Sequence, residues 1–405
     1  MRTLLLENIH PRATALLADA GWEVEALPRR LEGEVLREAL RGVSVLGIRS
    51  GTRITEELLT AAESLLVVGV FSIGTSQVDL AAASRHGVAV FNAPFSSTRS
   101  VVELAIAEMI ALARRLPETN ANMHSGIWDK SSDGVHEIGG RTLGIIGYGN
   151  IGSRLSTLAE ALGMTVCFYD VVPREPVGNA RQCATLDELL ESADVVSIHV
   201  DGRAENQELL GEAQLSSMRP GSLLLNLSRG FVVDQKALRR HIESGHIAGA
   251  AFDVFATEPK LRGDPFLSEL RGLPNVILTP HIGGSTEEAQ RNIAEFVVAR
   301  LLDYTRTGGT ELSVNFPQIA LPWTDGTHRL AHLHADVPGV LAAVNQALAQ
   351  RGVSIRGQAL ATRNGLGYVL TDTDAVTEGA EPLLSELRGM RATIRLRTPG
   401  RDGES

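Results

Sequence analysis

The sequence has few cysteines and no long apolar run. Cys167 and Cys183 are the only two cysteines in 405 residues, and their spacing matches no metal or redox motif. So few thiols in a chain of this length are typical of a reducing compartment, where we expect both to be small buried side chains. No apolar stretch approaches the roughly 18 residues that a membrane helix needs. We therefore predict a cytoplasmic protein with no membrane helix and no metal site.

Basic residues are scarce relative to acidic ones. The chain carries 38 Lys and Arg against 48 Asp and Glu, a formal net charge of -10, and it has no dense basic run. Nucleic acids and anionic membrane surfaces are bound through basic patches, so neither is expected as a partner. The first residues, MRTLLLENIHPR, contain too short an apolar run for a signal peptide, and we expect the protein not to be exported.

Two series of alternating strands and helices follow one another along the chain. Strand-like runs in the first are RTLLLEN, VSVLGIRS, LLVVGVF and GVAVFNA, and in the second TLGIIGYG, TVCFYD, DVVSIHV, GSLLLNLS, AGAAFDV and NVILTPH. Such alternation predicts an α/β fold with parallel sheets, here two doubly wound, Rossmann-like domains. The helical segment EEAQRNIAEFVVARLLDYTRT is then expected to return the chain to the first domain. We therefore predict a discontinuous first domain, residues 1–97 and 286–316, with the second, residues 98–285, inserted in it.

The segment SVVELAIAEMIALARRL joins the two predicted domains. Its apolar residues recur at helical spacing, so it predicts a long helix. Ser100 followed by Glu103 matches a capping box, which predicts that the helix starts at Ser100.

A smaller unit follows the proline-containing linker NFPQIALPWTDGTH. Over residues 329–398 the predicted order is a strand from Arg329, a helix from Pro338, two strands, a helix from Glu378 to Arg388, and a last strand. The order βαββαβ is that of the ferredoxin-like split motif. The sequence therefore predicts a third, C-terminal domain of this type.

The segment GIIGYGNIG supplies the first chemical motif. Gly147, Gly149 and Gly152 have G-x-G-x-x-G spacing between a predicted strand and a predicted helix. In this motif the first glycine permits a tight turn, the second lets the backbone approach a pyrophosphate, and the third allows close helix packing. Asp170 ends the next strand, 23 positions after Gly147, where a carboxylate binds the ribose hydroxyls of adenosine. A dinucleotide is therefore the predicted cofactor.

Asp170 also bears on which dinucleotide binds. Its carboxylate repels a 2′-phosphate, so NAD is favoured over NADP, although the nearby Arg174 leaves NADP open. The alternative role for Asp170 is that of a strand-end cap.

Three reactive residues follow strands of the second series. Arg229 comes after LLLNLS, Glu258 after AAFDVFAT and His281 after NVILTP, so all three are expected at the carboxyl edge of one sheet, where ligands bind. Oxidation of a 2-hydroxy acid needs a base, which His281 provides, and a cation for the carboxylate, which Arg229 provides. Glu258 would fix the imidazole tautomer and raise its pKa. Each residue taken alone has an alternative role. Arg229 could form a surface ion pair, Glu258 could be a solvated acid in a loop, and His281 could be a histidine packed in the core.

The segments that hold this trio, NLSRG, DVFATEP and LTPHIGGST, resemble those of the D-isomer-specific 2-hydroxyacid dehydrogenases. The resemblance implies that Arg229, Glu258 and His281 are the catalytic residues, with His281 as the acid/base. It also implies NAD contacts beyond the glycine motif and Asp170, from Asn150, Ile151, Leu227, Ser228, Arg229, Asp253, His281, Gly283 and Gly284.

Further segments, FSIGTSQVD, FNAPFSSTRSVVE, GIWDK and VNFP, resemble one branch of this family. Its members oxidise a phosphorylated three-carbon 2-hydroxy acid at the entry to serine synthesis, and they carry a C-terminal ACT regulatory module. The likeness covers residues 1–398 and implies a homo-oligomer, a homotetramer. It also implies a substrate side formed by Arg49, Ser50, Ile73, Gly74 and Lys130.

Phosphate is the physical reason for Arg49 and Lys130, because a dianion needs more than the one arginine that holds the carboxylate. The alternative for Lys130 is an exposed, solvated cation. Two positions depart from the branch. Gly51 stands where some relatives have a second arginine, and Ser97 where asparagine is usual. Both departures affect expected substrate contacts, and neither affects the trio.

The ACT-like segment departs further at its expected effector site. Serine-sensitive relatives read H-x-N-x-P-G and G-V-N-I, whereas this chain has HADVPG and GVSI. His334 is retained, but Asp336 and Ser354 replace the two amides. A carboxylate at 336 cannot donate to the carboxylate of serine and repels it, so we predict weak or absent serine inhibition, or another effector. The alternative role for Asp336 is to cap the helix that follows.

Two other functions remain open from the sequence. A reductase of hydroxypyruvate, glyoxylate or 2-oxoglutarate would also use Arg229, which holds any 2-oxo acid. A non-catalytic NAD(H)-sensing interaction protein is an alternative from a different class, and the ACT-like segment argues against it.

Overall fold

The computed structural model describes residues 1–259, 263–374 and 380–400. The chain divides into two compact units, one made of residues 1–96 with 290–405 and the other of residues 97–289. The segment of the second unit therefore interrupts the first in sequence. In the part of the chain that the structure describes, we find no helix long and apolar enough to span a membrane.

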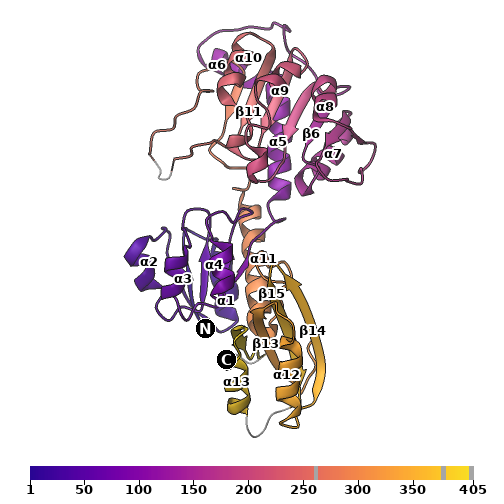
Figure 1. Cartoon of the computed structure of the whole chain (residues 1–405). Helices are drawn as coiled ribbons and strands as arrows, with labels where there is room; N and C mark the ends of the chain where they lie inside the picture. Colours follow the sequence, from indigo (N-terminus) through magenta and orange to yellow (C-terminus); the bar gives the residue numbers. More distant parts are fainter. Residues whose placement is uncertain (260–262, 375–379, 401–405) are drawn as a thin grey trace. The chain divides into compact units, whose positions relative to one another are not determined.

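The N-terminal part of the first unit is a five-stranded parallel sheet in the order β2-β1-β3-β4-β5, flanked by helices (Figure 1). Its strands are β1 (Arg2–Leu5), β2 (Glu23–Ala26), β3 (Val45–Ile48), β4 (Val67–Val70) and β5 (Ala89–Phe91). Its helices are α1 (Pro11–Asp19), α2 (Gly33–Ala39), α3 (Glu56–Ala61) and α4 (Leu80–Arg85). The four predicted strands are present, and β2 is an additional one. Strand β2 could not be predicted, because this edge strand, EVEA, has no buried residue and therefore no apolar run in its sequence.

The second unit is a seven-stranded sheet in the order β12-β11-β10-β9-β6-β7-β8, parallel throughout. Its strands are β6 (Thr142–Ile146), β7 (Thr165–Tyr169), β8 (Arg181–Gln182), β9 (Val195–Ile198), β10 (Ser222–Asn226), β11 (Ile247–Phe252) and β12 (Val276–Leu278). Its helices are α5 (Thr98–Ala113), α6 (Leu116–His124), α7 (Asn150–Ala161), α8 (Leu186–Ser192), α9 (Glu212–Ser217) and α10 (Gln235–Glu243), with single turns of 3-10 helix η1 (Ala204–Asn206) and η2 (Gly230–Val232). The six predicted strands are present, and the two-residue β8 is added at one edge.

The predicted capping box of α5 is wrong. The helix begins at Thr98, two residues before the predicted start, and its N-cap Ser97 makes no side-chain cap hydrogen bond. Ser100 lies inside the first turn and is buried, while Glu103 forms an ion pair with Arg99. Helix α5 forms because its apolar positions, including Val101, pack into the core of the second unit.

The C-terminal segment is a four-stranded antiparallel sheet in the order β14-β15-β13-β16, as the βαββαβ pattern predicts. Its elements are β13 (His328–Ala335), α12 (Val340–Ala349), β14 (Ile355–Arg363), β15 (Leu366–Thr373), α13 (Ala380–Gly389) and β16 (Thr393–Arg397), and the long α11 (Glu287–Thr307) precedes it. The predicted start of the second helix at Glu378 lies outside the described residues.

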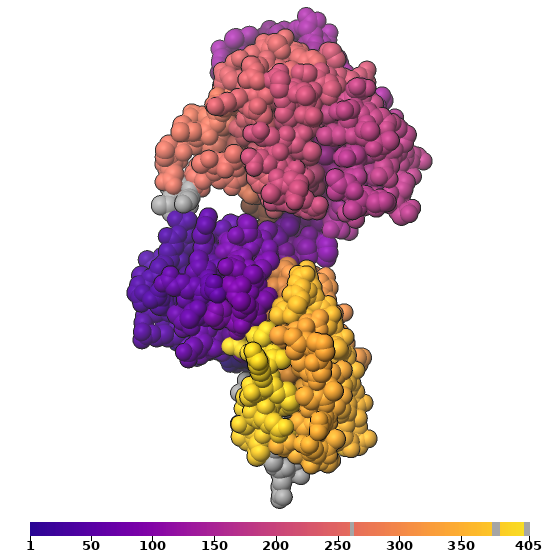
Figure 2. All heavy atoms as spheres, viewed as in Figure 1, coloured from indigo at the N-terminus to yellow at the C-terminus, as the bar shows by residue number. Residues whose placement is uncertain are grey.

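The C-terminal segment packs against the N-terminal part of the same unit, because apolar residues of both, such as Phe91 and Tyr368, belong to one core. Figure 2 shows the atoms of the two segments side by side. Arg395 of β16 donates to the backbone carbonyls of Leu65 and Gly87, at 2.6 and 3.1 Å. The buried hydroxyl of Tyr368 donates to the carbonyl of Gly308, at 2.8 Å. These contacts join the C-terminal segment to backbone atoms, so they do not depend on the side chains of the residues that accept them.

A buried ion pair lies within the C-terminal sheet, between β13 and β15, and its arginine also binds the linker. The guanidinium of Arg329 is fully buried and donates to both oxygens of Asp372, at 2.6 and 2.7 Å. Its remaining donors reach the carbonyls of Thr307, Leu321 and Pro322. The group also stacks on the ring of Trp323, at 4.8 Å. Each donor direction of the guanidinium is therefore used, which is the condition under which a buried charge is tolerated.

We expect Asp372→Asn to destabilise the C-terminal segment by about 3–5 kcal/mol, because it leaves the Arg329 charge buried and unpaired. The measurement is denaturant unfolding followed by tryptophan fluorescence, since Trp323 stacks on the affected group. The matched control is Asp374→Asn, which removes an exposed ion pair with Arg356 just beyond the same strand. Equal midpoints for the two variants would contradict this account of the pair.

Candidate active site

The glycine motif lies between β6 and α7, where the sequence placed it. Gly147 has a φ of +91°, and a Cβ there would lie 2.6 Å from the carbonyl oxygen of His199. A Cβ at Gly152 would lie 2.3 Å from the carbonyl oxygen of Gly147. Both positions therefore require glycine, the first for its backbone conformation and the second for the close approach of α7 to the turn.

The start of α7 has the features of a phosphate site. Gly149 is the N-cap, no side chain caps the helix, and a Cβ built on Gly149 would meet no atom within 4 Å. The free N–H groups of the first helical turn, at Asn150 and Ile151, therefore face a space in which no side chain blocks a ligand. The helix dipole favours an anion at this position. The residues at this turn fit a pyrophosphate.

Asp170 follows β7 at the same edge of the sheet. Its carboxylate accepts from the backbone N–H of Tyr148, at 2.9 Å, and from that of Val172, at 3.1 Å. Arg174 lies 3.3 Å from the same carboxylate. The bond to Tyr148 fixes Asp170 beside the glycine turn, as binding of an adenosine ribose requires. Arg174 forms an ion pair with Asp170, which neutralises part of the positive charge that a 2′-phosphate would need. This arrangement favours NAD over NADP.

The segment after β10 carries Leu227, Ser228 and Arg229. Leu227 and Ser228 are buried, and Asn226 Oδ1 accepts from both the N–H and the hydroxyl of Ser228, at 3.1 and 2.8 Å. Asn226 also donates to the carbonyl of Arg229, at 2.9 Å. One guanidinium nitrogen of Arg229 donates to the carbonyl of Ser228, at 2.6 Å. Asn226 therefore fixes the backbone that presents Arg229, and sequence reasoning had not singled it out.

Gly230 brings the Arg229 segment against the segment that leads to Glu258. A Cβ at Gly230 would lie 1.9 Å from the carbonyl carbon of Phe255 and 2.3 Å from the nitrogen of Ala256. No side chain fits in that space, so the two backbones touch. The geometry of Arg229 and that of Glu258 are consequently linked through the backbone.

Glu258 and His281 form the central pair. His281 Nδ1 lies 3.0 Å from each carboxylate oxygen of Glu258, and the N–H of Phe255 donates to Glu258 Oε1, at 3.1 Å. Burial alone would raise the pKa of Glu258, but the hydrogen bond and charge of His281 lower it. The bond to Glu258 raises the pKa of His281, against burial and the charge of Arg229. Glu258 therefore holds Nδ1 and leaves Nε2 for a ligand.

His281 has a backbone conformation that few residues other than glycine adopt, with a φ of +55°. Asp253, which is buried at the end of β11, holds this turn. Its carboxylate accepts from the Thr279 hydroxyl at 2.7 Å, the Ile282 N–H at 2.7 Å and the Gly283 N–H at 2.8 Å. A strained backbone conformation persists only where surrounding contacts hold it. Here the three hydrogen bonds to the buried Asp253 carboxylate hold it.

Gly283 and Gly284 follow in the same turn and pack closely. A Cβ on Gly283 would lie 3.0 Å from a carboxylate oxygen of Asp253, and one on Gly284 would lie 3.3 Å from Cβ of Ser97. The second unit thus gathers all the predicted cofactor residues and the catalytic trio at the carboxyl ends of its strands.

The predicted substrate residues Arg49, Ser50, Ile73 and Gly74 lie in the other unit, after β3 and β4. The carboxylate of Glu7 accepts from the backbone N–H groups of Arg49 at 3.2 Å, Gly51 at 2.7 Å and Thr52 at 2.8 Å. Sequence reasoning missed Glu7. Glu7 and Asn8 both have positive φ values, of +66° and +53°, which give a local turn, but an acidic residue after an apolar strand was the only signal in the sequence.

Asn92 holds the neighbouring loop by donating to the carbonyl of Ile73, at 2.5 Å, and the Ser72 hydroxyl donates to the carbonyl of Gly74, at 3.0 Å. Lys130 belongs to the second unit instead. Its ammonium lies 5.6 Å from the ring centre of Trp128, which is 73% exposed. The structure thus places four of the five predicted substrate residues on one sheet edge and Lys130 in an exposed segment of the other unit.

The predicted effector residues do not lie together. His334 and Asp336 are at the end of β13 that pairs with Gly367, whereas Ser354 precedes β14 where Ile355 pairs with Thr373, at the opposite end of the sheet. His334 is buried, its Nδ1 lies 2.8 Å from the carbonyl of Ala335, and its ring faces Gly367.

The alternative role proposed for Asp336, to cap α12, is wrong. The N-cap of that helix is Gly339, and it makes no side-chain cap bond. Asp336 is exposed, so its carboxylate stays in water at the end of the sheet.

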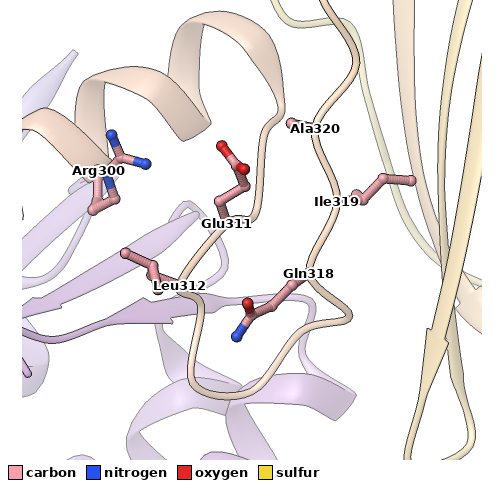
Figure 3. A pocket seen from close by; sticks show the side chains of 6 residues that line it. All are labelled: Arg300, Glu311, Leu312, Gln318, Ile319 and Ala320. Carbon is pink, nitrogen blue, oxygen red and sulfur yellow. The ribbon is translucent and has the colours of Figure 1, made fainter. Parts of the chain in front are cut away.

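A cavity of about 500 Å³ lies elsewhere in the first unit (Figure 3). It is lined by Arg300, Glu311, Leu312, Gln318, Ile319 and Ala320. None of the predicted site residues is among them.

The chain is similar in sequence and in fold to known dehydrogenases. The family model of the NAD-binding domain of D-isomer-specific 2-hydroxyacid dehydrogenases matches residues 106–283, and that of the ACT domain of the small-subunit type of AHAS matches residues 330–395. A D-lactate dehydrogenase from Aquifex aeolicus, solved with NAD and lactic acid, superposes with a TM-score of 0.66 at 28% identity, over 75% of this chain and 95% of that one.

Relatives align along nearly the whole chain. D-3-phosphoglycerate dehydrogenase of Escherichia coli K12 is 48% identical over 398 residues, 98% of this chain and 97% of that protein. The Dictyostelium discoideum enzyme of the same name is 45% identical over 397 residues, again 98% and 97%. The chain is a D-isomer-specific 2-hydroxyacid dehydrogenase. Within that class it belongs to the D-3-phosphoglycerate dehydrogenase family, and the predicted family, fold class and NAD cofactor are confirmed.

Proposed function

We propose that this protein oxidises 3-phospho-D-glycerate to 3-phosphohydroxypyruvate with NAD, reversibly, as the first step of L-serine synthesis. The observation that carries the proposal is the alignment with phosphoglycerate dehydrogenases over 98% of the chain, together with the Glu258–His281 pair at 3.0 Å. In this proposal residues 1–97 and 286–316 bind the substrate, residues 98–285 bind NAD and residues 329–398 bind an effector.

Arg229, His281 and Glu258 have separate roles in the proposed reaction. Arg229 holds the substrate carboxylate with the guanidinium nitrogens that Ser228 does not use. His281 Nε2 takes the proton of the C2 hydroxyl as the C2–O bond becomes a carbonyl, and Glu258 stabilises the resulting imidazolium. NAD, held at the glycine turn and Asp170, would supply the acceptor for the hydride that leaves C2. In reduction, His281 returns its proton to the carbonyl oxygen.

In this proposal the phosphate is recognised by Arg49, which belongs to the first unit, and by Lys130, which belongs to the second. A second candidate function, reduction of a smaller 2-oxo acid, is favoured by one observation. Gly51 stands where some relatives have arginine, and its N–H is bound to Glu7 at 2.7 Å. The loop therefore offers one arginine fewer to a dianion.

Two further parts of the proposal concern the whole molecule. Cys167 and Cys183 are buried and free, in keeping with a reducing cytoplasm. We also propose a homotetramer. Because His334 and Ser354 lie at opposite ends of one sheet, an effector that touched both would need two copies of the chain.

The substrate test compares 3-phosphohydroxypyruvate with hydroxypyruvate, glyoxylate and 2-oxoglutarate in the oxidation of NADH. We expect the highest kcat/KM for the phosphorylated acid, and we expect Arg49→Ala to reduce that value by about 10²-fold while sparing the small acids, because it removes a charge-assisted contact to phosphate. The control is Arg53→Ala, an exposed arginine four residues away. A preference for a small acid would establish the second candidate function.

The pH dependence tests the roles of Glu258 and His281. Reduction needs protonated His281, so activity is present below the pKa of His281 and is lost as the pH rises through it. Glu258→Gln removes the carboxylate whose hydrogen bond and charge raise this pKa, and we expect the loss of activity to move to lower pH. The measurement is kcat/KM for reduction across the pH range, with Glu243→Gln, an exposed acid paired with Arg239, as the control. An unmoved profile would contradict the role of Glu258.

The effector prediction concerns L-serine. We expect millimolar or weaker inhibition in the wild type, because the Asp336 carboxylate repels that of serine, and we expect Asp336→Asn to strengthen inhibition by about tenfold through the restored donor. Titration of serine into the reaction measures this, with Asp325→Asn in the preceding linker as a control for charge alone. Micromolar inhibition of the wild type would overturn the prediction.

A further inference from the structure

A buried carboxyl on α5 has no role in the mechanism above. Glu108 is 3% exposed, and neither of its oxygens has a hydrogen-bond partner among the described residues. It lies among the apolar residues through which α5 packs on the sheet, near Met109 and Leu112. A charged carboxylate without partners is unfavourable in such a place, so the group is expected to keep its proton.

The groups that act on Glu108 belong to the active-site turn. Asp253 follows β11 and Thr279 follows β12, and both strands pack against α5. Burial, followed by the charge of Asp253, raises the pKa of Glu108 to about 8. The Thr279 hydroxyl opposes the rise, although in this structure it donates to Asp253 and not to Glu108. Among the described residues no charge from β10, α6 or α7 contributes. Glu108 is thus linked to the carboxylate that holds His281.

We propose that Glu108 is a positioning residue of the reaction: its buried carboxyl, on the helix that packs against β11 and β12, keeps the turn of residues 279–283, and with it His281, in the observed conformation. The Asp253 carboxylate accepts hydrogen bonds from Thr279, Ile282 and Gly283. An ionised Glu108 would place a second negative charge beside it and attract the Thr279 hydroxyl away from Asp253. The inference rests on the proposed roles of His281 and Asp253.

The proton on Glu108 has a consequence that kinetics can detect. At pH 7 the carboxyl is neutral and the turn is intact. As the pH rises through about 8, the group ionises and competes with Asp253 for the Thr279 hydroxyl. His281 also feels the charge of Asp253, so a disturbed turn changes the acid/base group itself. The isosteric Glu108→Gln variant cannot ionise, and it should keep the turn intact at alkaline pH.

The first measurement is direct. Infrared difference spectra between wild type and Glu108→Gln, recorded at pH 7 and again at about pH 9.5, report the carbonyl stretch of a protonated carboxyl. We expect this band in the wild type at pH 7, its loss at alkaline pH, and its absence in the variant. Absence of the band in the wild type at pH 7 would overturn the proposal.

The second measurement is kinetic. We expect the ratio of kcat for Glu108→Gln to that of wild type to be near one at pH 7 and to rise about fivefold by about pH 9.5, with KM for NADH changed less than kcat. The control is Glu103→Gln, on the same helix but exposed and paired with Arg99. A ratio independent of pH, or the same change in the control, would show that Glu108 is a structural residue only.

Thr279→Val provides a second variant in case Glu108→Gln folds poorly. It removes the hydroxyl for which the two carboxyls compete, so its activity should lose the alkaline dependence that Glu108 confers. His281→Ala separates this inference from the proposed function. If His281→Ala stays active, the proposed acid/base role fails. If it is inactive and the Glu108 variants show no pH effect, only the role of Glu108 fails.

Discussion

The carboxylate of Asp253 is the acceptor on which the active-site geometry depends. It is buried at the end of β11 and accepts three hydrogen bonds from the turn that follows β12. These bonds hold His281 at a positive φ, from which its Nδ1 meets Glu258. Without this acceptor the backbone of His281 would relax to a commoner conformation, and the imidazole would point elsewhere.

The trio is assembled through backbone contacts more than through side chains. Gly230 allows the Arg229 segment to touch the backbone at Phe255, three residues before Glu258, and Glu258 in turn accepts from the N–H of Phe255. Parallel strands end at one edge of the sheet, which brings these loops together, and glycine lets them approach. The chemistry therefore relies on close packing at one sheet edge rather than on a long network of side chains.

Much of the fold and of the site could be predicted, because strands and helices can be recognised from the spacing of apolar residues along the sequence. The positions of Arg229, Glu258 and His281 at strand ends, the glycine turn and the βαββαβ unit all come from local patterns. The roles of Glu7 and Glu108 could not, because each depends on partners from other parts of the chain. The sole hint for Glu108 was an acid on the apolar face of a helix. The mistaken capping box at Ser100 shows that tertiary packing, not a local motif, set the start of α5.

The binding of Glu7 to the loop after β3 has a bearing on how substrate preference can diversify. Within residues 1–259, 263–374 and 380–400, the donors to Glu7 are main-chain N–H groups, those of Arg49, Gly51 and Thr52. Any residue except proline supplies such a group, so the side chains on this loop can be exchanged while its path stays the same. Under the proposed role of Arg49, single replacements at 49–51 would change which distal group of the acid is recognised, while the path of the loop and the turn that holds His281 stay unchanged.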